Sequence, residues 1–199
     1  RDQLVEVGWQ GAGTHTLLPF PDFPPMRRHT EGIQDLLDKY PVGVHDPERT
    51  AQILRRKGWS RSGNRFWEKD GETLKILIDI TPIFQDLAPI LKAQLSRAGF
   101  DANFRMTQDV YTRVTQGEAR AFLNGHGGSV RDPHFTLSFY HSRHVRPTGT
   151  FAEYPWRWSN TDFDAIVEEM GRTAPDDPRL AGQFRRAMEI WLAELPSVP

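Results

Sequence analysis

The stretch that decides the fold runs from Thr73 to Leu123 and reads TLKILIDITPIFQDLAPILKAQLSRAGFDANFRMTQDVYTRVTQGEARAFL. Within its first eight residues, 73–80, leucine or isoleucine stands at every second position. This period of two predicts a β-strand. Because Leu77 lies on the opposite face from those residues, we expect the strand to be covered on both sides.

Helices and strands alternate along the rest of this stretch. In order, the pattern predicts a helix that ends at Gly99, a strand over 100–106, a helix over 109–116 and a strand over 120–123. This order is typical of a parallel sheet with right-handed crossovers and helices on both faces. We therefore predict a mostly parallel α/β fold in which Ile80, Met106 and Leu123 lie along one edge of the sheet.

A glycine-rich loop, 125–129, follows the third predicted strand. Open α/β sheets hold ligands where the carboxyl ends of their strands open into such loops, so we place the binding surface here. His126 and Ser129 would supply hydrogen bonds, and the glycines would let the backbone approach a ligand closely. The predicted ligand-binding residues are His126, Gly127, Gly128, Ser129, Gln108, Trp156 and Trp158.

The segment 154–158, Tyr-Pro-Trp-Arg-Trp, is the most unusual in composition. Aromatic planes beside an arginine can stack on sugar rings or on peptide side chains. The same residues could equally anchor a loop to the core. Both interpretations stay open at this point.

The sequence favours neither a nucleotide loop nor a metal site. The glycine loop lacks the Lys-Ser/Thr of a phosphate-binding P-loop. Histidines stand at positions 126, 134, 141 and 144, in segments that we interpret as loops, and their spacing does not match the helical HExxH pattern. We therefore predict no metal and no cofactor.

Catalysis has little support in the sequence. Ser129 with a histidine and Asp132 could be imagined as a triad, but Ser129 does not lie in a GxSxG elbow. We interpret Asp132-Pro133 as a structural turn. The prediction is that the protein is not an enzyme, with a hydrolase or a protein-interaction module as the alternatives.

Length and composition suit one globular domain over residues 1–199, with 38% hydrophobic and 26% charged residues. The formal net charge of -1 favours neither nucleic acid nor an acidic membrane as a partner. The absence of cysteine excludes disulfides and a thiol nucleophile. The chain opens at Arg1 without a signal peptide and stops at Pro199, and we interpret it as a segment of a longer protein.

Capping and breaking residues predict the remaining elements. The expected elements are a short helix over 1–7, irregular chain over 18–25, a short helix around 33–37, a helix from Asp46 to Lys57, a hairpin at 65–67 between the turns Gly63-Asn64 and Asp70-Gly71, and helices at 162–170 and from Asp177 to Leu195.

Several segments together resemble the family 5 extracellular solute-binding proteins of bacterial ABC importers, the group of the dipeptide and oligopeptide receptors. The segments that carry the resemblance are Arg1–Leu4 with Gly11–Gly13, Tyr40 with His45–Ala51, Leu54–Trp59, Asp70-Gly71, Leu91–Phe100, Tyr111–Gly117, Asp132-Pro133, Trp158–Asp164 and Arg185–Pro196. They span nearly the whole chain.

The resemblance implies a periplasmic-binding-protein-like lobe of type II, mainly the second lobe of a two-lobed receptor. Such a receptor is a periplasmic or extracytoplasmic monomer that captures a small solute and delivers it to the permease subunits of the importer. Peptide receptors of the family carry an aspartate, three residues before the acidic-Pro step, that pairs with the peptide's ammonium group. Ser129 stands there in this chain, and His126 stands where an aromatic residue is usual. An oligopeptide and an oligosaccharide therefore both stay open as ligands, with 154–158 resembling the sugar-binding members.

Overall fold

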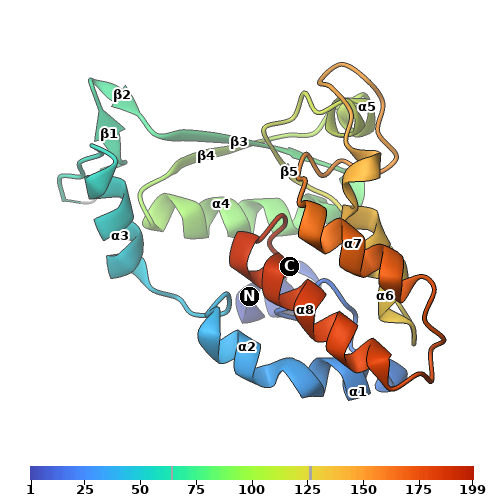
Figure 1. Ribbon diagram of the computed structural model, residues 1–199. Coiled ribbons are helices and arrows are strands. Elements are labelled where there is room, and N and C mark those ends of the chain that lie inside the picture. Colours follow the sequence, from blue (N-terminus) through green and yellow to red (C-terminus); the bar gives the residue numbers. More distant parts are fainter. Residues whose placement is uncertain (64, 126) are drawn as a thin grey trace. The chain divides into compact units, whose positions relative to one another are not determined.

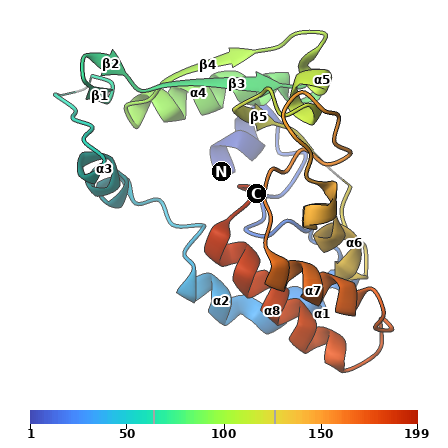
Figure 2. The same cartoon turned by 45° about the horizontal axis from the view of Figure 1, so that its top comes forward.

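The computed structural model describes residues 1–63, 65–125 and 127–199 (Figure 1). The chain falls into two compact units, which Figures 1 and 2 draw and which we describe in turn. The first unit comprises Arg1–Thr14, Val44–Val114 and Glu118–Gly125, and the second comprises His15–Gly43, Thr115–Gly117 and His126–Pro199. That residues 1–199 act as one lobe stays a prediction.

A three-stranded parallel sheet forms the centre of the first unit. Its strands are β3 (Lys75–Ile80), β4 (Asp101–Arg105) and β5 (Ala121–Leu123), in the order β4-β3-β5. The register pairs Asp79 with Arg105 and Ile80 with Leu123. The parallel sheet predicted from the sequence is confirmed, and the carboxyl ends of its strands lie along one edge.

Helix α4 (Ala88–Arg97) covers one face of this sheet and follows a 3₁₀ segment, η3 (Pro82–Leu87). Pro89 lies in the first turn of α4, where a backbone N–H would have no helical partner. The helix therefore begins near the proline instead of kinking at it. Its buried contacts are with Ile78 and Ile80.

The other face is covered only towards the carboxyl end of β3. There α5 (Val110–Thr115) buries Val110 and Val114 with Ala119 and the partly buried Phe122. Leu77, further back on this face, is 44% exposed. Our expectation that the whole strand is covered on both sides was wrong at Leu77, since α5 is too short to reach along the strand.

Asp79 is the one acid buried in this sheet among the described residues, with 1% of its surface exposed. Arg105 donates from Nε to Oδ1 at 2.5 Å and from Nη2 to Oδ2 at 2.8 Å. Nε of Arg113 lies 3.8 Å from Oδ1. The buried carboxylate is thus neutralised by a bidentate arginine on the neighbouring strand.

The first unit also contains a helix and a hairpin that precede the sheet. Helix α3 (Pro47–Arg56) begins after Asp46, whose carboxylate accepts the Arg49 N–H at 2.8 Å. Strands β1 (Glu68–Lys69) and β2 (Glu72–Thr73) pair around Asp70 and Gly71, whose φ values of 53° and 81° make a two-residue turn. The hairpin predicted at 65–67 therefore lies later in the chain. A short π-helical segment, η1 (Leu4–Gly8), replaces the helix expected over 1–7.

The second unit is helical. Helix α7 (Thr161–Met170) follows the predicted cap at Asn160, whose side chain accepts the N–H groups of Asp162 and Phe163. Helix α8 (Arg179–Glu194) has Pro178 at its N-cap position, and the Asp177 carboxylate accepts the Arg179 N–H at 2.9 Å. The core of the second unit is largely aromatic and aliphatic, and its largest fully buried side chains include Trp191, Tyr140, Phe163, Phe184, Met170 and Met188.

Two expectations in the second unit were wrong. Helix α1 (Pro24–Thr30) begins at the two prolines of a segment expected to be irregular, because proline fits the first turn of a helix. It continues through η2 (Glu31–Ile33) into α2 (Gln34–Lys39). The histidine-rich segment expected to be loop forms α6 (Pro133–Leu137) and the 3₁₀ turns η4 (Ser138–Tyr140) and η5 (Ser142–His144). None of the helices in the described ranges is long and apolar enough to cross a membrane.

Asp79→Ala is expected to lower the free energy of unfolding by about 2 kcal/mol or more, because it leaves Arg105 without the carboxylate that binds both of its donors. Urea unfolding followed by circular dichroism measures this. As the matched control, Asp101→Ala removes a half-buried carboxylate of the neighbouring strand that accepts a hydrogen bond from the Asn103 amide at 3.3 Å, and should change stability by less than about 0.5 kcal/mol. Equal effects of the two variants would contradict a special role for the buried pair.

Candidate functional site

The loop that follows β5 contains the predicted glycine site. His126 lies outside the described residues. Gly127 is exposed, and a Cβ placed on it would have no atom within 4 Å. A Cβ on Gly128 would lie 2.5 Å from Cδ of Pro21, so this position accepts only glycine without a shift of the proline. Of the two, only Gly127 has open space where a side chain would be.

Ser129 is buried and bonded to one neighbour, Thr136 of α6. Its surface is 1% exposed, and that of Thr136 is 0% exposed. The Ser129 N–H donates to Thr136 Oγ1 at 2.8 Å, the Ser129 hydroxyl donates to the same oxygen at 3.0 Å, and the Thr136 N–H donates to Ser129 Oγ at 3.0 Å. These three hydrogen bonds attach the loop to α6. A ligand contact by Ser129 stays a prediction, and the burial of its side chain does not favour it.

Asp132 has the structural role that the sequence predicted for the Asp-Pro step. Its side chain is the N-cap of α6 and accepts the His134 N–H at 3.0 Å. Among the described residues, neither Asp132 nor Ser129 forms a hydrogen bond to a histidine side chain. The imagined serine triad is therefore not assembled in this part of the chain.

Trp156 is half-buried, with one ring face against the core. Its ring stacks on that of Tyr140, with centroids 5.1 Å apart and planes at 10°. Tyr140 in turn packs edge-on against Trp191 of α8, with centroids 5.8 Å apart. The stack joins the 154–158 segment to the core, which is the anchoring role left open in the sequence.

Trp158 is anchored by both its ring and its nitrogen. Its ring packs edge-on against Phe163, with centroids 4.9 Å apart, and Nε1 donates to Glu194 Oε2 at 2.5 Å. The Asn160 amide, which caps α7, donates to the other oxygen of Glu194 at 2.7 Å. The indole N–H of Trp158 is therefore already hydrogen-bonded within the protein.

Arg157, between the two tryptophans, is a structural clamp that sequence reasoning missed. Its guanidinium donates to the Thr115 carbonyl at 3.1 Å and to the carbonyl of Arg146. It packs on Gly117, where φ is +71° and a Cβ would lie 2.5 Å from Arg157 Nε. No local spacing links residues 115–117 to 157, so only the fold reveals this contact.

Gln108 is exposed in the turn between β4 and α5 and belongs to the first unit. The other predicted contacts that the structure describes belong to the second unit. Gln108 as a ligand contact stays a prediction.

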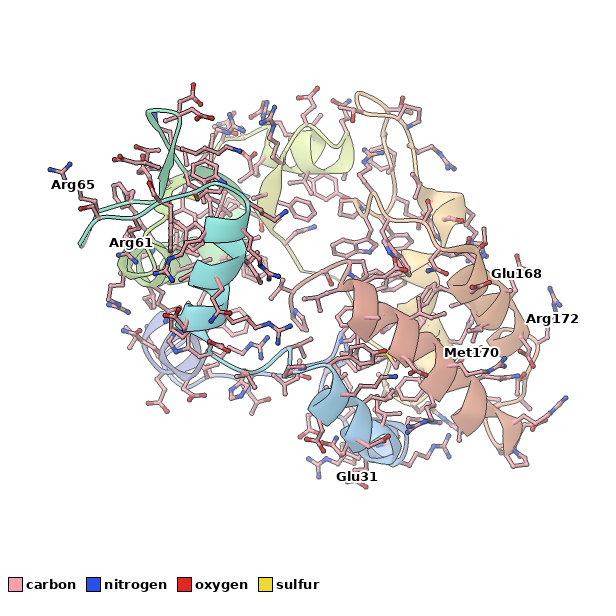
Figure 3. The ribbon with its side chains drawn as sticks, turned by 60° about the vertical axis from the view of Figure 1, so that its left-hand side comes forward. Glu31, Arg61, Arg65, Glu168, Met170 and Arg172 are labelled. Carbon is pink, nitrogen blue, oxygen red and sulfur yellow. The ribbon has the colours of Figure 1, made fainter. Side chains whose placement is uncertain are left out.

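His141 belongs to a polar cluster that no sequence pattern predicted. It is 7% exposed, its Nδ1 accepts the Arg143 N–H at 3.1 Å, and the same nitrogen lies 3.4 Å from Asp164. Its Nε2 lies 3.5 Å from Glu168, which Figure 3 labels on α7 beside Arg172. In the described ranges, no group of three or more His, Asp or Glu residues has an arrangement that could hold a metal ion.

Burial lowers the pKa of the His134 and His144 side chains in the same region. For His134, the nearby Asp132 opposes the effect of burial, and for His144 the nearby Arg143 adds to it. Both imidazoles therefore favour the neutral form more than an exposed histidine does.

Thr136→Val is expected to lower the free energy of unfolding by about 1 to 2 kcal/mol, because the Ser129 N–H and hydroxyl both lose their acceptor in a buried site. Thermal or urea unfolding measures the change. Ser138→Ala, which removes a hydroxyl bonded to the Phe135 carbonyl at a more exposed position, is the control and should cost less than about 0.5 kcal/mol.

Tyr140 links stability to alkaline pH. Burial raises its pKa from 10.0 to about 12, and a hydrogen bond with Ser197 opposes this. The neutral phenol therefore contributes stability that is fully present below pH 10.0 and is lost as the pH rises to about 12. Tyr140→Phe removes this contribution, so the stability difference between the native protein and the variant should shrink over that window in urea unfolding. A difference that does not change with pH would contradict it.

The chain resembles known proteins in its three-dimensional structure. No family model matches the chain, and no curated protein matches it. The whole chain superposes with a TM-score of 0.80 and 18% identity on 38% of a periplasmic oligopeptide-binding protein of an ABC transporter from Thermotoga maritima, solved with mannohexaose bound. DppA from Helicobacter pylori, solved with the peptide STSA, matches over 100% of this chain and 35% of its own, with a TM-score of 0.69 and 17% identity.

NikZ from Campylobacter jejuni, solved with Ni(L-His), matches 98% of this chain and 38% of its own, with a TM-score of 0.71 and 15% identity. The chain therefore spans less than two-fifths of the length of each of these proteins. At these identities the likeness establishes the fold. The chain has the periplasmic-binding-protein-like fold that its sequence resembles.

Proposed function

We propose that this chain is the part of a solute-binding protein of an ABC importer that contributes one wall of the ligand site. The observation that carries the proposal is the likeness of the entire chain to solute-binding proteins, at a TM-score of 0.80 for the Thermotoga maritima protein. Such a protein needs only to bind and to change conformation, without chemistry. The lack of an assembled triad or metal cluster in the described residues is compatible with that role.

The ligand class that we propose is an oligopeptide or an oligosaccharide. The three similar structures were solved with mannohexaose, with a nickel–histidine complex and with the peptide STSA. Ser129 stands where the resemblance predicts an ammonium-binding carboxylate, and it is buried against Thr136. If a peptide binds, another residue must therefore pair with its amino terminus, since an ammonium ion taken out of water needs a partner.

Two contacts on this chain are the best supported for such a ligand. Gly127 is exposed, and a Cβ placed on it would have no atom within 4 Å. Trp156 is half-buried with its inner face on Tyr140, which leaves the partly exposed side of a rigid ring for stacking. Because the chain spans 38% of the Thermotoga maritima protein, we propose that the rest of the receptor supplies the remaining contacts.

The proposed setting is extracytoplasmic, with a monomeric receptor that delivers its solute to membrane permease subunits. The support is the class of the neighbouring proteins, which are periplasmic binding proteins of transporters. No observation on the described residues favours the hydrolase or the interaction module considered as alternatives.

Trp156→Ala is expected to weaken binding of an oligomannoside about tenfold or more in the intact receptor, if the ring stacks on the sugar. A thermal-shift screen with oligomannosides, di- to pentapeptides and nickel–histidine identifies the ligand first, since saturation at about a hundred times Kd adds about 2.7 kcal/mol of stability. Isothermal titration then gives the affinity of the variant.

Trp9→Ala is the matched control, because Trp9 is an exposed tryptophan of the first unit, away from the predicted contacts in sequence. If the folded Trp156→Ala protein binds the sugar with unchanged affinity, the hypothesis that the Trp156 ring stacks on the sugar is wrong. Absence of any shift with all three ligand classes would contradict the proposed function itself.

A further inference from the structure

Basic side chains are concentrated in one segment of the first unit. From Arg49 to Lys69 the sequence contains seven Lys or Arg residues and one acid, Glu68. The whole chain has 25 basic and 26 acidic residues, so the remainder carries an excess of acids. The near-neutral total therefore hides a strongly basic segment.

Helix α3 presents the first part of this charge to solvent. Of its ten residues, only Ala51 is buried. Arg49, Arg56 and the adjoining Lys57 are exposed, and within the described residues their side chains form no hydrogen bond or ion pair. In the same ranges Arg55 is the one basic residue of the segment that pairs with a carboxylate, that of Glu48 at 3.2 Å.

The second part of the charge lies between α3 and β1. Figure 3 views this side of the first unit and labels Arg61 and Arg65. Arg61 donates to the carbonyls of Arg65 at 2.6 Å and Arg97 at 3.1 Å, and Lys69 donates to the Lys57 carbonyl at 3.1 Å. Carbonyl acceptors hold these side chains in place but do not neutralise them, so the positive charge is available to an anionic partner.

Apolar side chains are exposed among these bases. Ile53, in the middle of α3, is 36% exposed, and Phe66, next to Arg65, is 37% exposed. Bases interleaved with exposed aliphatic and aromatic residues are typical of surfaces that lie on anionic bilayers, where the charges meet headgroups and the apolar groups enter the interface. A duplex nucleic acid offers no comparable apolar layer on its backbone.

We propose that the exposed face of α3 and the adjoining Lys57, formed by Arg49, Ile53, Arg56 and Lys57, binds the anionic phospholipid headgroups of a bilayer surface. The attraction is electrostatic with a small apolar contribution, so it is reversible and weakens as salt screens the charges. The proposal depends on the charge distribution of this chain and not on the function proposed above.

The test is sedimentation of the full chain with vesicles of phosphatidylcholine alone and with vesicles that also contain phosphatidylglycerol. Binding is expected only to the anionic vesicles and should fall as salt is raised. The triple variant Arg49→Gln, Arg56→Gln, Lys57→Gln keeps helix propensity and removes three charges. Its partition onto anionic vesicles should drop about a hundredfold, at about fivefold for each charge.

The matched control is Lys92→Gln, Arg120→Gln, Arg131→Gln, which removes the same charge from exposed positions outside the segment. Circular dichroism establishes that both variants are folded. Equal loss in the two variants would overturn the proposal, because net charge alone would explain binding. Binding to duplex DNA or to an acidic polypeptide without binding to anionic vesicles would also overturn it.

Discussion

The parallel pairing of β3 with both β4 and β5 is the constraint on which the first unit depends. It brings together three strands that are far apart in the chain and aligns their carboxyl ends at one edge. The same register places Asp79 opposite Arg105, so this buried acid has its partner on the adjacent strand. Parallel strands need long crossover connections, and α4 and α5 supply both the connections and the cover for the two faces.

In the second unit, aromatic packing does the corresponding work. Residues 154–158 run along the helical core and attach to it by alternate side chains, with Tyr154 stacked on Phe139 and Trp156 on Tyr140. Arg157, between Trp156 and Trp158, donates to the main-chain carbonyls of Arg146 and Thr115. The 154–158 segment, whose composition suggests stacking on a ligand, therefore mainly anchors the chain to the core. A ligand could contact only those parts of its rings that the core does not cover.

Charge is distributed as unevenly as the packing. Ion pairs between α7, α8 and α2 bind many of the acids and bases of the second unit to one another, as in Arg185 with Asp35 and Arg186 with Glu169. In the first unit, the bases of α3 and of the turn after it have few such partners among the described residues. Ion pairing cancels much of the electrostatic field of the second unit. The bases of the first unit keep a positive field that can attract an anionic partner.

Local sequence determined the strands and helices between Lys75 and Leu123 and the later helices α7 and α8, because alternation, caps and turn dipeptides act over a few residues. It did not determine α1 or α6, which lie in segments expected to be irregular or loop. The strands at 73–123, the caps at Asp46 and Asn160 and the turn at Asp70-Gly71 are all visible in the sequence and all present in the structure. Ser129 was predicted as a ligand contact and is buried against Thr136. For Trp156 and Trp158 the sequence left ligand stacking and anchoring to the core open, and their packing on Tyr140 and Phe163 supports anchoring. Only the tertiary structure decided three features: the burial of Ser129, the pairing of Asp79 with Arg105, and the bonds of Arg157 to the carbonyls of Thr115 and Arg146. Each depends on a contact between residues that no local pattern connects.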